Sequence, residues 1–284
     1  MRSSSLAMVG AVGFLLVSAS GCRIEAHSQT QFENSSQAPK VSVKAWDGEA
    51  ITITNAGINP ASGTTGVEVK VSSTATTITA EATFAAYADD DKESDAQLSI
   101  KEAIATLVIE ESTNGFNVKC GHGGAHGSST VAGSGCKILR VTIPAGTALK
   151  PHNLTVGTGS GSIRVGLANA GDAMPYVSNL LVDNNGLGEV DVRVNPVKGA
   201  VLVVTGDDSV QVALPRAFSA GKVLFTVDES DLTKANARII TTDFPGMASG
   251  SSYPAAGATA DAAASLNVQS KGPFSDDTVR ITAF

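Results

Sequence analysis

Residues 141–215 contain the runs that decide the fold, which are VTIPAG (141–146), LTVGTGSGSIRVGL (154–167), LLVDNNGLGEVDVRVNP (180–196) and VLVVTGDDSVQVALP (201–215). Apolar and polar side chains alternate within them, as in 190–194 and 210–214. Such alternation is typical of a strand with one buried face. Gly, Asn, Asp or Pro interrupts each run, and no helical segment separates one run from the next. This spacing predicts an all-β barrel, sandwich or solenoid.

The composition favours a thin aliphatic core. Hydrophobic residues make up 42% of the 284-residue chain, but only 5% of the residues are aromatic. Val, Ile, Leu and Ala must therefore fill the interior, which suits layers of stacked short strands better than a broad sandwich built around a Trp. The net charge is −7 and no basic patch stands out, so we expect no nucleic-acid partner.

Residues 1–21 have the features of a bacterial export signal. Arg2 supplies a positive charge, and 6–17 form an apolar segment that is too short to span a bilayer. The ending Ala19-Ser20-Gly21-Cys22 resembles the lipobox of bacterial lipoproteins, although Ala stands where Leu is commonest. This resemblance implies that Cys22 is acylated and anchors the protein to a membrane. Arg23, in place of Asp, then implies the outer membrane. Ordinary signal-peptidase cleavage is the alternative.

Residues 22–45 are polar and predict a flexible tether between the anchor and the fold. The ordered part is expected to begin at Trp46. An acidic run at 89–95 lacks the Gly and Glu that an EF-hand calcium loop requires. We therefore interpret this run as a solvated surface.

One short helix is predicted from Asp95 to about Thr106. Ser94 and Gln97 have the spacing of a capping box at its start. The expected buried stripe consists of Leu98, Ala103, Ile104 and Leu107.

The most unusual segment is the glycine-rich stretch from Cys120 to Cys136, which also contains His122 and His126. Two thiolates and two imidazoles suit zinc or copper, but their spacing is not a standard zinc pattern. After export to an oxidising compartment, with Cys22 carrying the lipid, Cys120 and Cys136 are expected to form a disulfide. Closing a loop of this size would stabilise the fold by about 3 kcal/mol. A metal-binding loop remains the alternative.

Residues 137–284 resemble the adhesin-like β-solenoid domain found in bacterial envelope proteins of unassigned function. The resemblance lies in VTIPAG (141–146), LTVGTGSGSIRV (154–165), GDDSVQVALP (206–215) and DTVRITAF (277–284). It implies a stack of rungs in which each new strand pairs with the rung before it. Residues 46–136 are expected to form an N-terminal β region that includes the Cys-bounded loop, and its segment 46–120, with the short helix, is expected to form the cap at one end. The family has no established catalytic residues, so the resemblance transfers none.

No local catalytic motif stands out in the chain. The glycine-rich turns match neither G-x-S-x-G, nor a P-loop, nor a dinucleotide-binding motif. The adjacent carboxylates Asp207 and Asp208 are expected to point apart, and His152 is expected at the surface.

We therefore predict a non-enzymatic, lipid-anchored envelope protein without a cofactor. Its partners are expected to be the membrane, through the lipid, and a protein or polysaccharide surface. The predicted contact face consists of the outward-pointing residues Arg164, Asp191, Arg193 and Gln211. The alternatives are a metal-binding protein that uses the Cys/His loop and an exported hydrolase whose site is assembled from distant residues.

Overall fold

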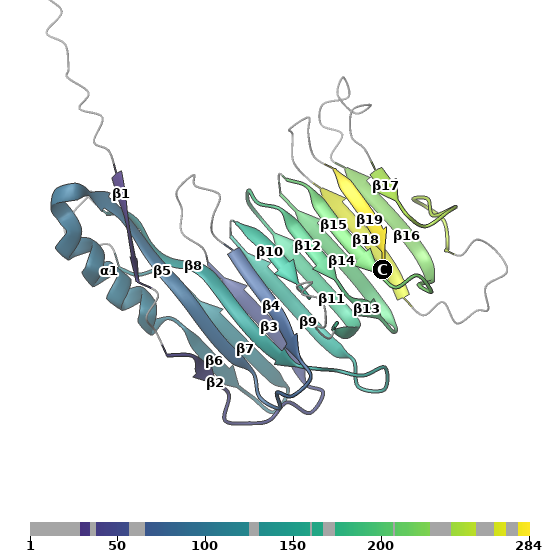
Figure 1. Ribbon diagram of the computed structural model, residues 1–284, viewed down its shortest axis with the longest axis horizontal. Helices are drawn as coiled ribbons and strands as arrows, with labels where there is room; N and C mark the ends of the chain where they lie inside the picture. Colours follow the sequence, from purple (N-terminus) through teal and green to yellow (C-terminus); the bar gives the residue numbers. More distant parts are fainter. Residues whose placement is uncertain are drawn as a thin grey trace, which may run out of the picture.

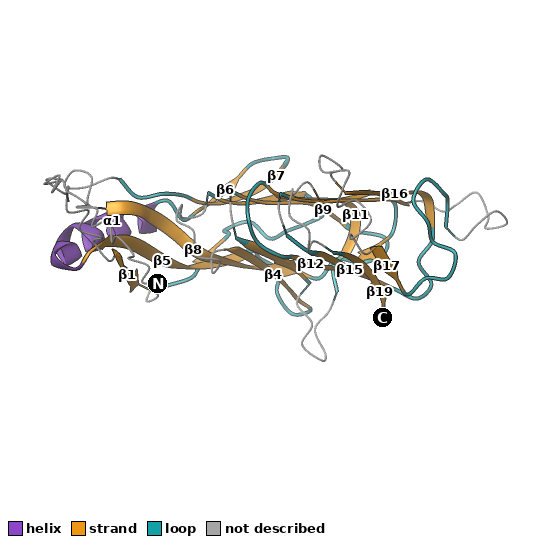
Figure 2. Ribbon diagram, turned by 90° about the horizontal axis from the view of Figure 1, so that it is seen from above, coloured by secondary structure: helices purple, strands orange, loops and turns teal. Residues whose placement is uncertain are grey.

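The computed structural model describes residues 29–34, 38–56, 66–124, 131–159, 161–166, 174–206, 208–227, 240–253, 264–270 and 278–284. These residues form two β-sheets that lie face to face, and an α-helix closes one end of the elongated molecule (Figures 1 and 2). The prediction of a mostly β fold with a short helix is confirmed. The export signal and Cys22 lie outside the described residues.

Sheet A has the strand order β1-β5-β8-β4-β10-β12-β15-β19-β17, with β2 beside β5. Its strands are β1 (Gln29–Asn34), β2 (Lys40–Val41), β4 (Gly66–Ser72), β5 (Thr79–Asp89), β8 (Val131–Pro144), β10 (Ser162–Val165), β12 (Val190–Arg193), β15 (Val210–Leu214), β17 (Ile240–Thr242) and β19 (Val279–Ala283).

Sheet B has the order β16-β18-β14-β11-β9-β3-β7-β6, with β13 beside β11. Its strands are β3 (Ala50–Asn55), β6 (Val108–Glu111), β7 (Gly115–Cys120), β9 (His152–Thr158), β11 (Tyr176–Asn184), β13 (Asn195–Pro196), β14 (Gly199–Thr205), β16 (Ala220–Val227) and β18 (Ala264–Ser270).

From β8 onward, consecutive strands alternate between the two sheets, except for the short β13. We call one strand of each sheet, taken together along the chain, a pass, for example β9 and β10. Neighbouring strands in this part of each sheet are parallel and come from different passes of the chain. The stacking order nevertheless differs from the chain order at two places. β3 and β4 lie between the β7/β8 and β9/β10 passes, and β18 and β19 lie between the β14/β15 and β16/β17 passes. The expectation that each strand pairs with the pass before it is wrong there.

The physical reason at the far end lies in the aromatic residues. Phe218 and Phe244 contact each other edge to face, and Tyr253 packs edge-on against Phe244. The segment 248–253 also covers the edge of β16, because its backbone accepts hydrogen bonds from Ala220 and Val223. The β16/β17 pass therefore carries the groups that close the core, and it must be outermost.

Rows of aliphatic side chains fill the space between the sheets. One row of sheet A consists of Val69, Val165, Val192, Val212 and Ile281. The facing sheet contributes a row of Ile53, Val156, Val182, Val203 and Val268. Every one of these side chains is at most 1% exposed. Short branched side chains fill the roughly 10 Å between two packed sheets, which explains why so few aromatic residues are needed.

A buried polar row runs beside these aliphatic rows. Asn55, Thr158, Asn184, Thr205 and Ser270 are register partners on sheet B, and all are buried. The amide of Asn55 donates to the carbonyl of Gly66 at 2.9 Å. These side chains lie where the chain leaves sheet B, and the two asparagines supply donors that buried turn carbonyls require.

Helix α1 (Glu93–Ala105) packs against β5 and β8. Its buried residues are Ala96, Ser99, Ile100 and Ala103, so the predicted stripe is wrong at Leu98, which is 45% exposed. The capping box is also wrong. The helix continues from the 3₁₀ turn η1 (Asp90–Lys92), which places Ser94 inside the first turn, and its N-cap residue Lys92 makes no side-chain capping bond.

Strands also occur where a tether was predicted. β1 and β2 both pair with β5 in antiparallel fashion. β5 is long, and without these partners its outer edge would leave backbone groups unpaired. The predicted boundary between Cys136 and Lys137 falls inside β8, which pairs with both β4 and β5. No helix among the described residues is long and apolar enough to cross a membrane.

Candidate binding surface

A row of polar and charged side chains crosses the outer face of sheet A. Alternation along each strand places these residues outward, opposite the buried valines of the same strands. In order across the sheet, the outer charged row consists of Arg140, Glu68, Arg164, Asp191, Gln211 and Arg280. Neighbouring strands lie about 4.8 Å apart, so the row presents charges that alternate in sign from Arg140 to Asp191 at a regular spacing, followed by the neutral Gln211 and by Arg280. The structure places all the residues of the predicted contact face on this side of sheet A.

The charges of the row interact along the sheet. The Nε of Arg140 donates to Glu68 at 2.9 Å, and both side chains are partly exposed. Partial desolvation raises the pKa of the Asp191 carboxyl. Arg164 and Arg193 oppose this rise in pKa, and Glu189 adds to it. Charges of opposite sign therefore partly offset each other around Asp191, in the middle of the row.

A hollow of about 260 Å³ lies beside the middle of the row. It is lined by Val165, Gly166, Asp191, Arg193, Gln211, Ala213, Thr282 and Phe284. The guanidinium carbon of Arg193 is 4.9 Å from the centroid of the Phe284 ring. The Nε of Arg193 is buried and has no hydrogen-bond partner within the described part of the chain. Ala213, the register partner of Arg193 on β15, presents only a methyl group beside this guanidinium.

Gly166 is required at the edge of the hollow. Its φ is +71°, a conformation that residues with a Cβ rarely adopt. A Cβ at this position would also overlap the backbone oxygen of Arg193. The close approach of the two chain segments therefore depends on glycine.

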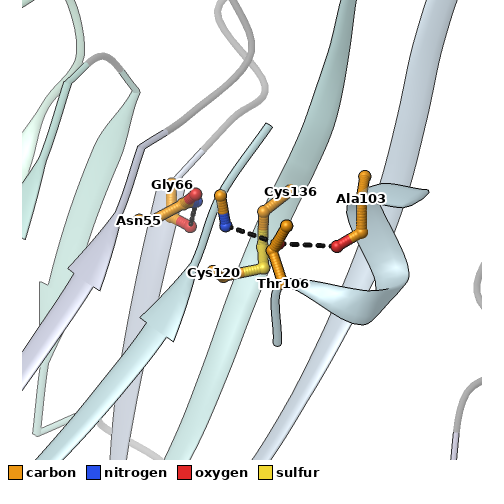
Figure 3. Close-up of a disulfide and its surroundings, with 7 residues drawn as sticks. Asn55, Gly66, Ala103, Thr106, Cys120 and Cys136 are labelled. Carbon is orange, nitrogen blue, oxygen red and sulfur yellow. Dashed lines mark hydrogen bonds between the residues drawn. A yellow bond between two sulfur atoms is a disulfide. The ribbon is translucent and has the colours of Figure 1, made fainter. Parts of the chain in front are cut away.

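The predicted Cys120–Cys136 disulfide is present and joins β7 of sheet B to β8 of sheet A (Figure 3). While it is intact, neither sulfur is a thiolate that could bind a metal. His122 is exposed, and His126 lies outside the described residues. Over the described ranges, no three His, Cys, Asp or Glu side chains gather in a metal-binding group.

The prediction of a surface position for His152 is wrong. This residue opens β9 with its side chain inward and is 0% exposed. Its ring stacks on Trp46 with centroids 4.3 Å apart, and its Nε2 lies 3.0 Å from the oxygen of Pro144. Desolvation lowers the pKa of His152 to about 4, against the opposing effect of the Pro144 hydrogen bond. The sequence around His152 does not indicate this burial, because it depends on the packing of Trp46 against the start of β9.

No protein-family model matches this chain, and no curated protein matches it. Among solved structures, the chain is similar to a candidate cell adhesion protein from Clostridium sporogenes. The two share 10% sequence identity with a TM-score of 0.46, over 87% of this chain and 100% of that chain. This likeness is too distant to bear on the fold or the function.

The chemistry available in the hollow is that of a polar binding site. Asp191 is the single carboxylate side chain among its lining residues, whereas glycoside hydrolysis generally requires two. Asp208 lies elsewhere and accepts a hydrogen bond from the backbone of Ser209 at 2.7 Å, while Asp207 is outside the described residues. A second hollow near β6 and β7 is lined in part by two carboxylates, Glu110 and Glu111. Glu110 pairs with Lys119 at 2.7 Å, and Glu111 accepts hydrogen bonds from the backbone of Val43 and Lys44.

Proposed function

We propose that this protein is an exported, lipid-anchored β-solenoid of the bacterial envelope that acts by adhesion. In this proposal, Cys22 carries the lipid, and the outer face of sheet A is the binding surface. The observation that carries the proposal is the outer charged row on this face. The protein acts by binding and not by catalysis.

The row supports an adhesive role because its spacing is set by paired backbone and not by mobile loops. Parallel strands hold Arg164, Asp191 and Gln211 in register with each other. The protein therefore loses little conformational entropy when it binds a partner with complementary charges. Alternating charges also favour a matching partner over surfaces of uniform charge.

The path of the chain supports the solenoid description. Between β8 and β19 the chain passes repeatedly from one sheet to the other, and each pass adds strands to both sheets. The aliphatic rows continue from pass to pass, so the passes share one core. A stack of this kind presents a long face at a distance from the anchored end.

A pair of charge-reversal variants tests the binding surface. Arg164→Glu with Arg280→Glu changes the outer charged row, whereas Lys198→Glu with Lys222→Glu makes the same charge change at exposed positions associated with sheet B. Binding of purified, labelled protein to envelopes of the producing organism would be measured. We expect the first pair to weaken binding by about tenfold or more and the second by less than about twofold. Equal binding by both variants would overturn the proposal.

The anchor and the non-catalytic role have separate tests. Intact mass of the protein from its membrane fraction should correspond to a chain that begins at Cys22 with added acyl chains. An unacylated mature chain would contradict the anchor.

Turnover of ester, glycoside or peptide substrates by purified protein, lost on substitution of Asp191, would contradict the non-catalytic role.

A further inference from the structure

The hollow beside Arg193 differs from the rest of the outer face of sheet A. Elsewhere on this face, Arg140 is already bonded to Glu68. In the hollow, the guanidinium of Arg193 lies over the Phe284 ring, and its buried Nε makes no hydrogen bond to any of the residues that the structure describes. The other guanidinium N–H groups of Arg193, which lines the hollow, are the donors for a ligand there.

We infer that this hollow binds a carboxylate-bearing sugar residue, a hexuronate, within an acidic polysaccharide. The inference deepens the proposed function and rests on it, since the hollow is part of the proposed adhesive face. It specifies the chemical class of the partner, an acidic polysaccharide, whereas the proposed function requires only a surface with complementary charges.

Arg193 is suited to the carboxylate of such a ligand. A guanidinium presents a planar fork of donors that matches the two oxygens of a carboxylate. The guanidinium carbon lies 4.9 Å from the centroid of the Phe284 ring, and this cation–π contact restrains the position of the guanidinium. Ala213 has only a methyl group, which leaves room in the hollow for a ligand beside the guanidinium.

The other lining residues are suited to sugar hydroxyls. Asp191 and Gln211 are register partners on neighbouring strands, and both line the hollow. A carboxylate accepts hydrogen bonds, and an amide both donates and accepts, as pairs of adjacent hydroxyls require. The hydroxyl of Thr282 adds a further donor and acceptor.

The charge around the hollow favours a monoanion over a phosphate. Arg164 and Arg193 lower the pKa of Asp191, and Glu189 raises it, so two positive and two negative groups influence one another here. A dianionic phosphate next to Asp191 would meet more repulsion than a single carboxylate. The volume of about 260 Å³ is below the range of about 300–1,000 Å³ typical of drug-sized ligands, which suits one sugar ring.

The test is calorimetric titration of the full-length mature protein with trigalacturonate and triglucuronate, and with neutral galactotriose and inorganic phosphate. We expect at least one acidic trisaccharide to bind at least about tenfold more tightly than galactotriose or phosphate. Arg193→Gln should weaken that binding at least about tenfold, and Arg193→Lys nearly as much, because lysine has no fork. Lys222→Gln, at an exposed position on β16 of sheet B, is the matched control, with an expected change below about twofold. Gln211→Ala supplies a second lining variant that leaves the Arg193–Phe284 contact intact.

Three results would overturn the inference. They are no binding of either acidic trisaccharide, equal binding of galactotriose, or preferred binding of phosphate. Unchanged affinity in folded Arg193→Gln or in Gln211→Ala would exclude this hollow as the site. If the wild-type protein still binds envelopes in these cases, adhesion stands and only the ligand class fails. Loss of envelope binding as well would remove both proposals.

Discussion

The side-chain amide of Asn184 donates hydrogen bonds to the carbonyls of Gly161, at 3.0 Å, and Gly188, at 2.7 Å. These glycines belong to turns that precede two neighbouring strands, β10 and β12. The Asn184 oxygen also accepts a bond from the backbone of Gly186 at 3.1 Å. One buried residue thus connects successive passes of the chain, and it does so at the point where the backbone has no sheet partners.

Replacing Asn184 with Ala should therefore destabilise the protein by about 2–4 kcal/mol, because one buried and one partly buried carbonyl lose their donor. Urea unfolding of the variant and the wild type measures this difference. Asn185→Ala is the matched control, since the neighbouring side chain is exposed. A loss below about 0.5 kcal/mol for Asn184→Ala would show that the buried row does not stabilise the turns.

His152 predicts a dependence of stability on pH. Its pKa is lowered from 6.5 to about 4 by burial, so the unfolded chain binds a proton before the folded one does. The stability linked to neutral His152 is full above pH 6.5, falls as the pH drops through 6.5, and stops falling near pH 4, where the folded form also protonates. From about pH 7 to about pH 5 the loss amounts to about 2 kcal/mol.

Urea unfolding at these two values of pH checks this prediction. In His152→Phe, the fall in unfolding free energy should be smaller by about that amount, because Phe does not titrate. His122→Gln should leave the fall unchanged, because His122 is exposed. Identical pH dependence in His152→Phe and the wild type would contradict the prediction.

At the scale of elements, the disulfide joins β7, which ends at Cys120, to β8, which contains Cys136. A hydrogen bond beside it reaches a third element, because the backbone N–H of Gly121, the residue after Cys120, donates to the Thr106 hydroxyl at the end of α1 at 2.7 Å. The Thr106 hydroxyl in turn donates to Ala103 at 2.6 Å (Figure 3). Both sheets and the helical cap are therefore held together where the core begins.

Reduction of the disulfide, or its replacement in Cys120→Ser with Cys136→Ser, should lower the unfolding free energy by about 3 kcal/mol. Chemical unfolding with and without reductant measures the loss, and a thiol assay on unfolded protein confirms the redox state. The double Ser variant should be insensitive to reductant, which makes it the control. If the unfolding midpoint of the wild type does not move on reduction, the bridge does not stabilise the fold.

At the scale of the molecule, the late strands β18 and β19 lie inside the stack. Each is paired on both edges, β18 with β14 and β16, and β19 with β15 and β17. β16 and β17 are thereby separated from β14 and β15, which precede them in the chain. The β16/β17 pass can join the sheets only through strands that follow it in sequence.

Hydrogen exchange should report this arrangement. Amides of 265–270 and 279–283 are expected to exchange more slowly than those of 240–242 at the end of sheet A, because inner strands open only when the stack opens. Exchange followed by mass spectrometry or NMR measures the order. Protection in β8, which also lies between two strands, is the reference. Faster exchange in 265–270 and 279–283 than in 240–242 would contradict the observed strand order.

Local pattern determined the strands and their inward faces. Alternation in 190–194 and 210–214 predicted which valines are buried and which polar residues point out, because a strand has a period of two whatever its partners. Compartment and cysteine count predicted the Cys120–Cys136 pair. The same alternation placed Asp191, Arg193 and Gln211 on a common outer face.

Only the tertiary structure decided how the passes stack and what lies between them. Backbone hydrogen bonds can form between any two strands, so the positions of β3/β4 and β18/β19 inside the stack appear only in the assembled sheets. The burial of His152, the buried row of Asn184 and the hollow at Arg193 each require residues from separate passes. No local pattern encodes such contacts, because they form between segments that are distant along the chain.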